Sequence, residues 1–209
     1  MAKRTKQAKP RAATPRDRIL DAALDLAGRS GWRNASLGAI AGEAGMPIGE
    51  VYGEFRSRAA IVRGLMSRTD AEVLATPTDA DETPRDRLFD ILMRRFDQLK
   101  PHRASLRSIA RDLLADPPAA LCSAPALLRS MAWMLEAAGV GTTGLCGRLR
   151  VRALVLLYLS VMRVFLADES EDLARTMAAL DRRLRQAAPW LGLAAGPSDS
   201  GRGAEKAAS

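Results

Sequence analysis

The chain has 209 residues and a formal net charge of +8, and 47% of its residues are apolar. This apolar fraction is enough for a buried core, and the length suits one large or two smaller domains at about 100–200 residues each. The longest uncharged apolar stretch, residues 153–162, is far shorter than the roughly 20 residues of a membrane-spanning helix. The N-terminus lacks the apolar core of a signal peptide. We therefore expect a cytoplasmic protein without stable membrane insertion.

Residue types that carry catalysis or bind metals are scarce. His102 is the single histidine, and Cys122 and Cys146 lie far apart without the spacing of a metal or disulfide motif. The sequence also lacks a Ser/His/Asp set and a glycine-rich phosphate loop. We expect no enzyme, no cofactor and no metal. The positive charge suits a polyanionic partner, nucleic acid or an anionic membrane, but it is equally compatible with ordinary solubility.

The composition favours an all-α fold, because aromatic residues make up only 4% and Ala and Leu dominate the apolar positions. Residues 1–13 are basic and lack periodicity, which predicts a disordered basic arm. Thr14 can cap a helix that has Pro15 at its first position and Asp17 where a capping-box carboxylate stands. Apolar residues at helical spacing follow, and this first helix ends near Gly28.

Two short helices are predicted next, joined by a sharp turn. Ser36 caps the first, and Gly45 ends it in a left-handed conformation. Pro47 opens the second, and Ser57 caps a longer fourth helix. The small core beneath the turn is formed by apolar residues from both helices: Ile40, Ala44, Met46 and Val51. This is a helix-turn-helix, whose second helix enters the major groove of DNA, and residues 14–75 form the predicted DNA-binding-type head.

Residues 16–66 resemble the DNA-binding head of the TetR family of transcriptional regulators. The matching positions include Ile19, Leu20, Asp21, Ala22, Ala23, Gly31, Ser36, Ile40, Ala41, Ala44, Gly45, Gly49, Val51, Tyr52, Phe55, Ser57, Arg58 and Ile61. The resemblance implies that Tyr52 and Arg58 contact backbone phosphates and that Ser36 faces the DNA backbone. The positions it places at base edges are Pro47, Ile48, Gly49 and Glu50.

Three residues depart from the family pattern: Gly38, Glu50 and Glu54. A carboxylate near phosphate is unfavourable, and phosphate contacts dominate affinity for DNA. Glu50 can instead accept a hydrogen bond from cytosine N4. Two interpretations stay open, one in which Glu50 reads a base and one in which both glutamates are solvated and DNA binding is weak. The basic arm either adds phosphate or minor-groove contacts or is merely a tail.

A polar break at residues 76–83 is the predicted domain boundary, and Thr83 to Asp86 then repeat the helix-start pattern seen at Thr14. Residues 84–190 predict a C-terminal helical bundle, and residues 191–209 a flexible tail. The apolar periodicity marks helices around residues 88–99, 106–113, 127–135, 149–166 and 173–184, with Pro117 and Pro118 stopping the second of these.

The family resemblance implies that this bundle holds a small-molecule pocket and forms a homodimer through its last two helices, residues 148–167 and 170–188. The expected dimer seam is Leu173, Met177, Leu180 and Leu184, unless this stripe packs within one chain. Tyr158 and Trp133 offer polar handles in a pocket that is otherwise apolar. The ligand-binding candidates, each of which is alternatively plain core, are Phe89, Met93, Phe96, Leu106, Ile109, Leu113, Met131, Trp133, Met134, Leu154, Tyr158 and Phe165.

A second resemblance covers residues 84–188. Residues 131–139 and 168–176 are similar to segments of the TetR-fold lipid-binding accessory proteins of ubiquinone biosynthesis, which implies an isoprenoid lipid ligand and a homodimer. The sequence thus predicts a TetR-type regulator that binds double-stranded operator DNA and responds to an apolar small molecule. The alternative is a lipid-binding accessory protein with weak or no DNA binding.

Overall fold

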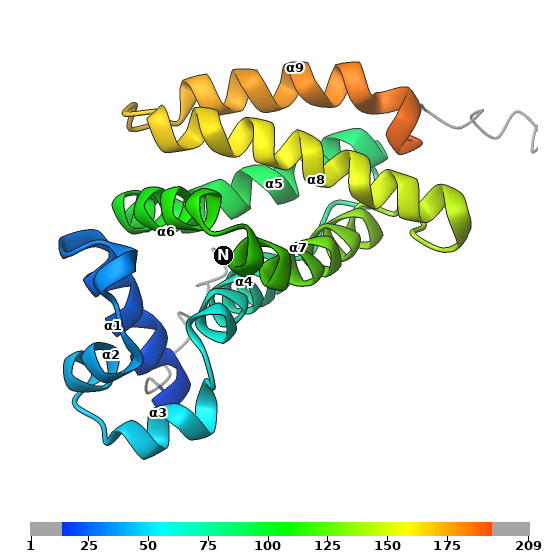
Figure 1. The fold of residues 1–209 in the computed structure, drawn as a ribbon. Helices are drawn as coiled ribbons and strands as arrows, with labels where there is room; N and C mark the ends of the chain where they lie inside the picture. The colour runs from blue at the N-terminus through cyan, green and yellow to red at the C-terminus, as the bar shows by residue number, and fades with distance from the viewer. Residues whose placement is uncertain (1–13, 194–209) are drawn as a thin grey trace, which may run out of the picture.

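The computed structural model describes residues 14–193, and every regular element in that range is a helix. Figure 1 shows a small head joined to a larger body. The head holds α1 (Pro15–Arg29), the short 3-10 turn η1 (Trp32–Asn34), α2 (Leu37–Ala44) and α3 (Ile48–Glu54). The helix α4 (Arg58–Leu74) connects the head to the body. The body is built from α5 (Pro84–Leu99), η2 (Lys100–His102), α6 (Arg103–Ala115), α7 (Pro117–Ala137), α8 (Gly144–Ala167) and α9 (Ala174–Leu191). This confirms the predicted all-α fold with a helix-turn-helix head. The predicted basic arm, residues 1–13, lies outside the described residues, as do residues 194–209.

The helix starts of the head follow the predicted caps. The Thr14 hydroxyl accepts a hydrogen bond from the Asp17 amide at 3.1 Å, and the Asp17 carboxylate accepts one from the Thr14 amide at 3.2 Å, which completes a capping box. Ser36 and Ser57 accept hydrogen bonds from backbone amides three residues later. Gly45 ends α2 with φ of 60°, a left-handed conformation that favours glycine. Local chemistry therefore fixes the turn between α2 and α3.

One buried cluster fills the head. Residues from α1 to α4 form it, and Ile109 from α6 joins it. At Gly64 of α4, an added Cβ would lie 2.6 Å from Cε1 of the fully buried Phe55, so only glycine lets this ring pack against the helix. The predicted residues beneath the turn, among them Ile40 and Val51, are buried. Because α1 also packs against α6, the head is tied to the body by more than its connecting helix.

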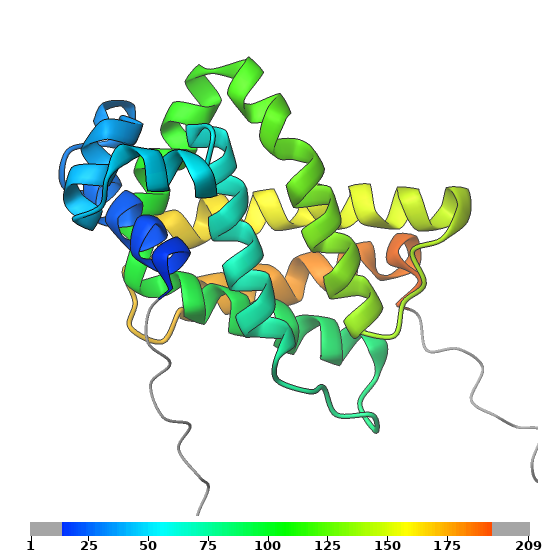
Figure 2. The ribbon, with the colours of Figure 1, turned by 90° about the horizontal axis from the view of Figure 1, so that it is seen from below.

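A second buried cluster fills the body, with contributions from α5, α7, α8 and α9. The last two helices, α8 and α9, run antiparallel along the side of the body away from the head (Figure 1). Figure 2 shows the same pair from below, beyond α4 and α7. Leu191 and Leu193 are buried, so the packed body extends beyond residue 190, where the flexible tail was predicted to begin.

Two further predictions are corrected by the structure. Pro117 and Pro118 do separate two helices, but they open α7, with the Asp116 carboxylate accepting a hydrogen bond from the Ala119 amide at 3.1 Å. The predicted dimer seam is wrong for Leu173, Leu180 and Leu184, which are fully buried within one chain, while Met177 is 44% exposed. The apolar face of α9 packs on α5 and α8 of its own chain, so the intramolecular interpretation holds for this stripe.

Candidate DNA-binding surface and ligand cavity

The start of α3 presents the residues that the sequence placed at base edges. Pro47 is the N-cap, and Gly49 and Glu50 are exposed in the first turn. Ile48 is 60% exposed and Tyr52 is 58% exposed, whereas Val51 on the opposite side is fully buried. Ser36 caps α2 and is itself exposed. The exposed Ile48 and Tyr52 on this short helix form a surface that is accessible to a binding partner.

The charges around this surface are arranged in a way that the sequence did not reveal. Glu54 forms an ion pair with Arg16 of α1, at 3.7 Å, and both side chains are more than 40% exposed. The Arg56 guanidinium lies 5.8 Å from the centre of the Tyr52 ring. Arg56 was not among the predicted DNA-binding residues, because it lies in the link between α3 and α4 and has no place in the family pattern. The ion pair compensates the charge of Glu54, and Arg56 adds a cation beside Tyr52.

Arg58 is oriented differently from the implied phosphate contact. Its guanidinium donates a hydrogen bond to the Trp32 carbonyl at 2.7 Å and lies 4.9 Å from the centre of the Trp32 ring. In this conformation the side chain stabilises η1 and does not extend toward the face of α3. The phosphate contact of Arg58 therefore stays a prediction.

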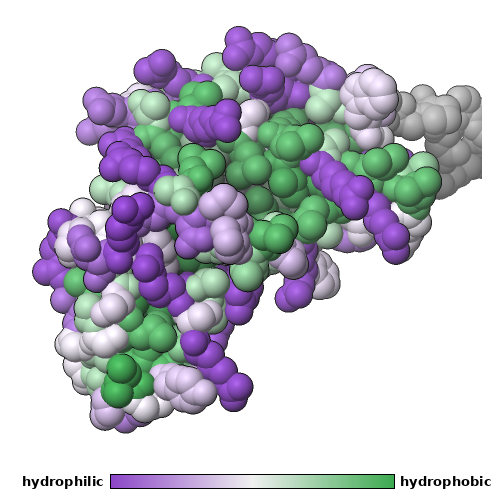
Figure 3. Space-filling view, viewed as in Figure 1, coloured by the Kyte–Doolittle hydropathy of each residue, from purple (hydrophilic) through white to green (hydrophobic). Residues whose placement is uncertain are grey.

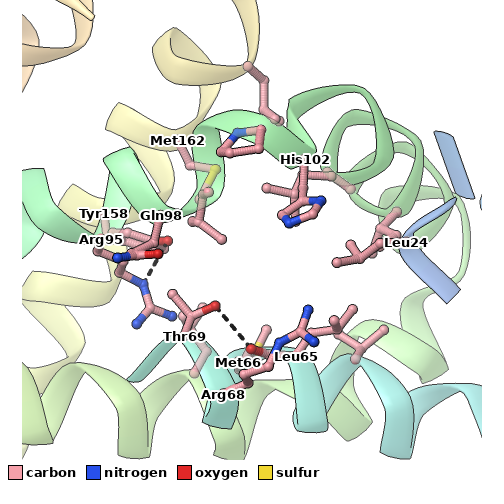
Figure 4. Close-up of a pocket in the computed structure, with 18 of the residues that line it drawn as sticks. Leu24, Leu65, Met66, Arg68, Thr69, Arg95, Gln98, His102, Tyr158 and Met162 are labelled. Carbon is pink, nitrogen blue, oxygen red and sulfur yellow. Dashed lines mark hydrogen bonds between the residues drawn. The ribbon is translucent and has the colours of Figure 1, made fainter. Parts of the chain in front are cut away.

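A cavity of about 440 Å³ lies where the head meets the body. Its wall is mainly apolar, and it draws on α1, α4, α5, η2, α6, α7 and α8 (Figure 4). In Figure 3, viewed from the same side as Figure 1, apolar surface gathers across the middle of the body. The lining residues are Asp21, Leu24, Val62, Leu65, Met66, Arg68, Thr69, Glu72, Arg95, Gln98, Leu99, Pro101, His102, Leu106, Ile109, Ala110, Leu113, Leu127, Tyr158, Leu159, Met162 and Leu166.

Four of the predicted ligand-binding residues line this cavity: Leu106, Ile109, Leu113 and Tyr158. Trp133 does not, and is 57% exposed on α7. The others pack in or against the buried cluster of the body, as in the alternative interpretation of plain core: Phe89, Met93, Phe96, Met131, Met134, Leu154 and Phe165. The prediction favoured the most apolar faces of the helices, which pack together and leave no space. The cavity lies instead beside these faces, where helices from the head and the body diverge.

Arg95 is a deeply buried charged residue in the cavity wall that was not among the predicted ligand-binding residues. It is 2% exposed, its Nε donates a hydrogen bond to the Tyr158 hydroxyl at 3.0 Å, and its Nη1 pairs with Asp70. Ser130 also donates to Asp70, at 2.7 Å. Burial disfavours the charged guanidinium, but Tyr158 and Asp70 outweigh this effect and raise the pKa of Arg95. The network joins α4, α5, α7 and α8.

Other kinds of site find little support in the described part of the chain. Within residues 14–193, no group of three or more His, Cys, Asp or Glu side chains is placed to hold a metal ion. No helix in this range has the length and apolarity to cross a membrane.

The head and the overall fold are both similar to those of known proteins. Residues 19–65 match the model of the bacterial regulatory proteins of the tetR family. No match is found among curated proteins. A TetR transcriptional regulator from Nitrosomonas europaea ATCC 19718 is similar in structure, with a TM-score of 0.69 and 26% identity over 84% of this chain and 98% of the other.

Two further solved structures show the same fold. A TetR transcriptional regulator from Rhodococcus sp. RHA1 has a TM-score of 0.64 and 22% identity, covering 82% of this chain and 94% of the other. Thermus thermophilus FadR, a TetR-family repressor solved in complex with lauroyl-CoA, has a TM-score of 0.53 and 21% identity, covering 81% and 91%. These comparisons do not confirm the resemblance to lipid-binding accessory proteins of ubiquinone biosynthesis. The chain has the helix-turn-helix head and the all-α fold of the TetR family of transcriptional regulators.

Proposed function

We propose that this chain is a cytoplasmic, homodimeric transcriptional regulator that binds operator DNA through α2 and α3. Its affinity for DNA changes when an apolar small molecule occupies the cavity. The observation that carries the proposal is that the cavity wall includes residues of the head itself. Leu24 of α1 and Val62 and Leu65 of α4 belong to the buried cluster of the head and also line the cavity.

This sharing gives a ligand a direct route to the head. A molecule in the cavity touches α1 and α4 on one side and α6 and α8 on the other. Because protein interiors are close-packed, filling the cavity biases the position of α1 and α4 against the body. In a dimer, such a shift alters the spacing of the two α3 helices, which must match half-sites about 34 Å or a multiple of it apart.

The surface of α8 supports the homodimer. Leu145, Leu149 and Leu156 are 74%, 55% and 70% exposed and lie on one face of this helix. The opposite face, which includes Leu154 and Tyr158, is buried in the body. A row of exposed leucines on one face of a helix is typical of a surface that contacts another protein. We therefore assign the dimer contact to this face of α8 in place of the buried stripe of α9.

Two observations favour the regulator over a lipid carrier without DNA binding. The ion pair of Glu54 with Arg16 reduces the repulsion that a carboxylate exerts on phosphate. The TetR-family repressor FadR from Thermus thermophilus shows that a protein of this fold accommodates an acyl-CoA ligand. We propose that this chain likewise takes a small molecule, while its DNA contacts remain those predicted for Tyr52, Ser36 and the start of α3.

Binding of the purified protein to DNA from upstream of its own gene tests the proposal. Affinity should fall steeply with salt, since phosphate contacts release counterions. Tyr52→Ala should weaken binding to specific and random DNA alike, whereas Glu50→Ala should change sequence preference. Glu169→Ala, at an exposed position in the α8–α9 loop, is the matched control and should leave both unchanged. Failure to bind any DNA at low salt would refute the regulator, and a uniform gain in Glu50→Ala would show that Glu50 reads no base.

A further inference from the structure

The cavity wall contains two side chains, Arg95 and Tyr158, that each keep a hydrogen-bond donor not used by a protein acceptor. Nε and Nη1 of Arg95 are engaged by Tyr158 and Asp70, but Nη2 has no hydrogen-bond partner among residues 14–193. The Tyr158 hydroxyl accepts from Arg95 and donates to no group in the same range. Arg95 is 2% exposed and Tyr158 is 4% exposed, and both line the cavity. Because both residues line the cavity, these donors are available to a ligand atom or a water that accepts hydrogen bonds at this end.

The rest of the cavity suits an apolar body. In Figure 4, Arg95, Tyr158 and Gln98 lie together at one end of the hollow, and Leu24 lies at the other. Leu106, Ile109, Leu113 and Leu127 add further apolar lining. The volume of about 440 Å³ lies within the roughly 300–1,000 Å³ of small-molecule pockets. The cavity therefore matches a medium-sized apolar molecule with its polar atom at one end.

The charges around the cavity disfavour an anion at that end. Asp70 already compensates Arg95, and Asp21 of α1, which also lines the cavity, pairs with Arg68 at 2.6 Å. Glu72 also lines the cavity. Two carboxylates and two guanidinium groups thus line the cavity, and Asp70, which is not a lining residue, pairs with Arg95. A ligand carboxylate would add a further negative charge in a place of low polarity. A neutral acceptor satisfies the same donors without that cost.

We propose that the cavity binds a neutral apolar molecule with a terminal carbonyl oxygen, which accepts hydrogen bonds from Nη2 of Arg95 and the Tyr158 hydroxyl. The inference rests on the proposed ligand-responsive function and specifies the chemical class of its ligand. The carbonyl end contacts the network of Asp70, Arg95 and Ser130, so the ligand meets α4 through its polar end as well as through its apolar body.

Equilibrium dialysis at neutral pH with three probes of nearly equal length tests this inference: 2-undecanone, decanoate and undecane. The ketone should bind about tenfold or more tightly than the alkane, because a hydrogen bond from a charged donor is worth at least that factor. It should also bind more tightly than decanoate. In Arg95→Lys, which keeps a cation beside Asp70 but removes the forked guanidinium, the preference for ketone over alkane should fall toward one. Arg94→Lys is the matched control, since Arg94 bonds the Thr76 carbonyl outside the cavity, and it should keep the preference.

Tyr158→Phe provides a second variant if Arg95→Lys fails to fold. It removes one oxygen, keeps the ring in its packing, and should reduce the ketone preference by about fivefold. Tighter binding of decanoate than of ketone, no ketone binding, or a preference unchanged in both cavity variants would overturn the inference. These measurements use no DNA. Ketone binding without an effect on DNA affinity would therefore support the ligand class and refute the proposed ligand response.

Discussion

The connection between α8 and α9 depends on Asp168, a buried carboxylate that accepts four hydrogen bonds. The Thr176 amide and hydroxyl donate to one oxygen at 2.8 and 2.7 Å, and the Ser170 amide and hydroxyl donate to the other at 3.2 and 2.5 Å. Asp168 and Thr176 are both fully buried. These bonds fix the reversal of the chain that lays α9 along α8. We predict that Asp168→Asn destabilises the protein while leaving the shape of the side chain unchanged.

The size of the effect follows from the lost acceptor. An asparagine turns its NH2 group toward one pair of donors, so at least one buried N–H or O–H loses its acceptor, at a cost of about 1–3 kcal/mol. The remaining hydrogen bonds also lose the contribution of the negative charge. We expect a loss of about 2–4 kcal/mol in the free energy of unfolding, a large share of the roughly 5–15 kcal/mol of a typical domain. Urea unfolding followed by far-ultraviolet circular dichroism measures it. The control is Asp172→Asn, because exposed Asp172 accepts one bond, from the Ala174 amide at 3.1 Å, and it should cost less than about 1 kcal/mol.

The same residue predicts a dependence on pH. Burial raises the pKa of Asp168, but the four hydrogen bonds outweigh this effect and hold it well below its usual range. A carboxyl whose pKa is lower in the folded state contributes stability that is fully present above its unfolded pKa of about 3.9 and is lost as the pH falls further. The difference between wild type and Asp168→Asn should therefore be constant from neutral pH to about pH 5 and shrink below pH 4. A difference that stays constant down to pH 3, or a variant as stable as wild type at pH 7, would refute this account.

Two other predictions concern the head and the dimer contact. Gly64→Ala places a Cβ 2.6 Å from the Phe55 ring. Overpacking at this contact should cost about 1–3 kcal/mol and outweigh the gain of up to about 1 kcal/mol in helix propensity. Thermal unfolding should therefore show a lower Tm, and an unchanged Tm would mean that the ring moves freely. Leu156→Glu should give a monomer in analytical ultracentrifugation. The control is Leu121→Glu on α7, because Leu121 is 75% exposed against 70% for Leu156, and this variant should remain a dimer. A dimeric Leu156→Glu would place the contact elsewhere.

The head could be predicted from the sequence because its determinants are local. Thr14, Ser36 and Ser57 each accept a hydrogen bond from an amide three residues later, so a cap is recognisable within four residues of sequence. Gly45 needs only its own left-handed backbone to end α2. The ion pair between Glu54 and Arg16 could not be predicted in this way, because its partners are brought together only by the packing of α1 against the later helices.

The cavity was harder to predict than the core, and Arg95 shows why. It follows Leu88, Ile91 and Leu92 on the buried stripe of α5, so its position in the sequence signals burial. Its charge suggests the opposite, since arginine is rarely buried unless it is paired. The partner that reconciles the two is Asp70, on the preceding helix and 25 positions away. A charged residue on an apolar stripe is the signal that would have identified it, but the sequence does not specify its partner.

The position of α4 connects these features. Gly64 on this helix receives the Phe55 ring, Val62 and Leu65 are shared between the head cluster and the cavity, and Asp70 is held by Arg95 and Ser130. No turn of α4 is therefore free to shift without disturbing the head, the cavity or the network. Since a close-packed helix moves largely as a unit, a ligand that changes the contacts of Asp70 or Leu65 also changes the position of Gly64 against Phe55. Ligand binding that leaves hydrogen exchange in α3 unaltered would show that α4 does not couple the cavity to the DNA-facing surface.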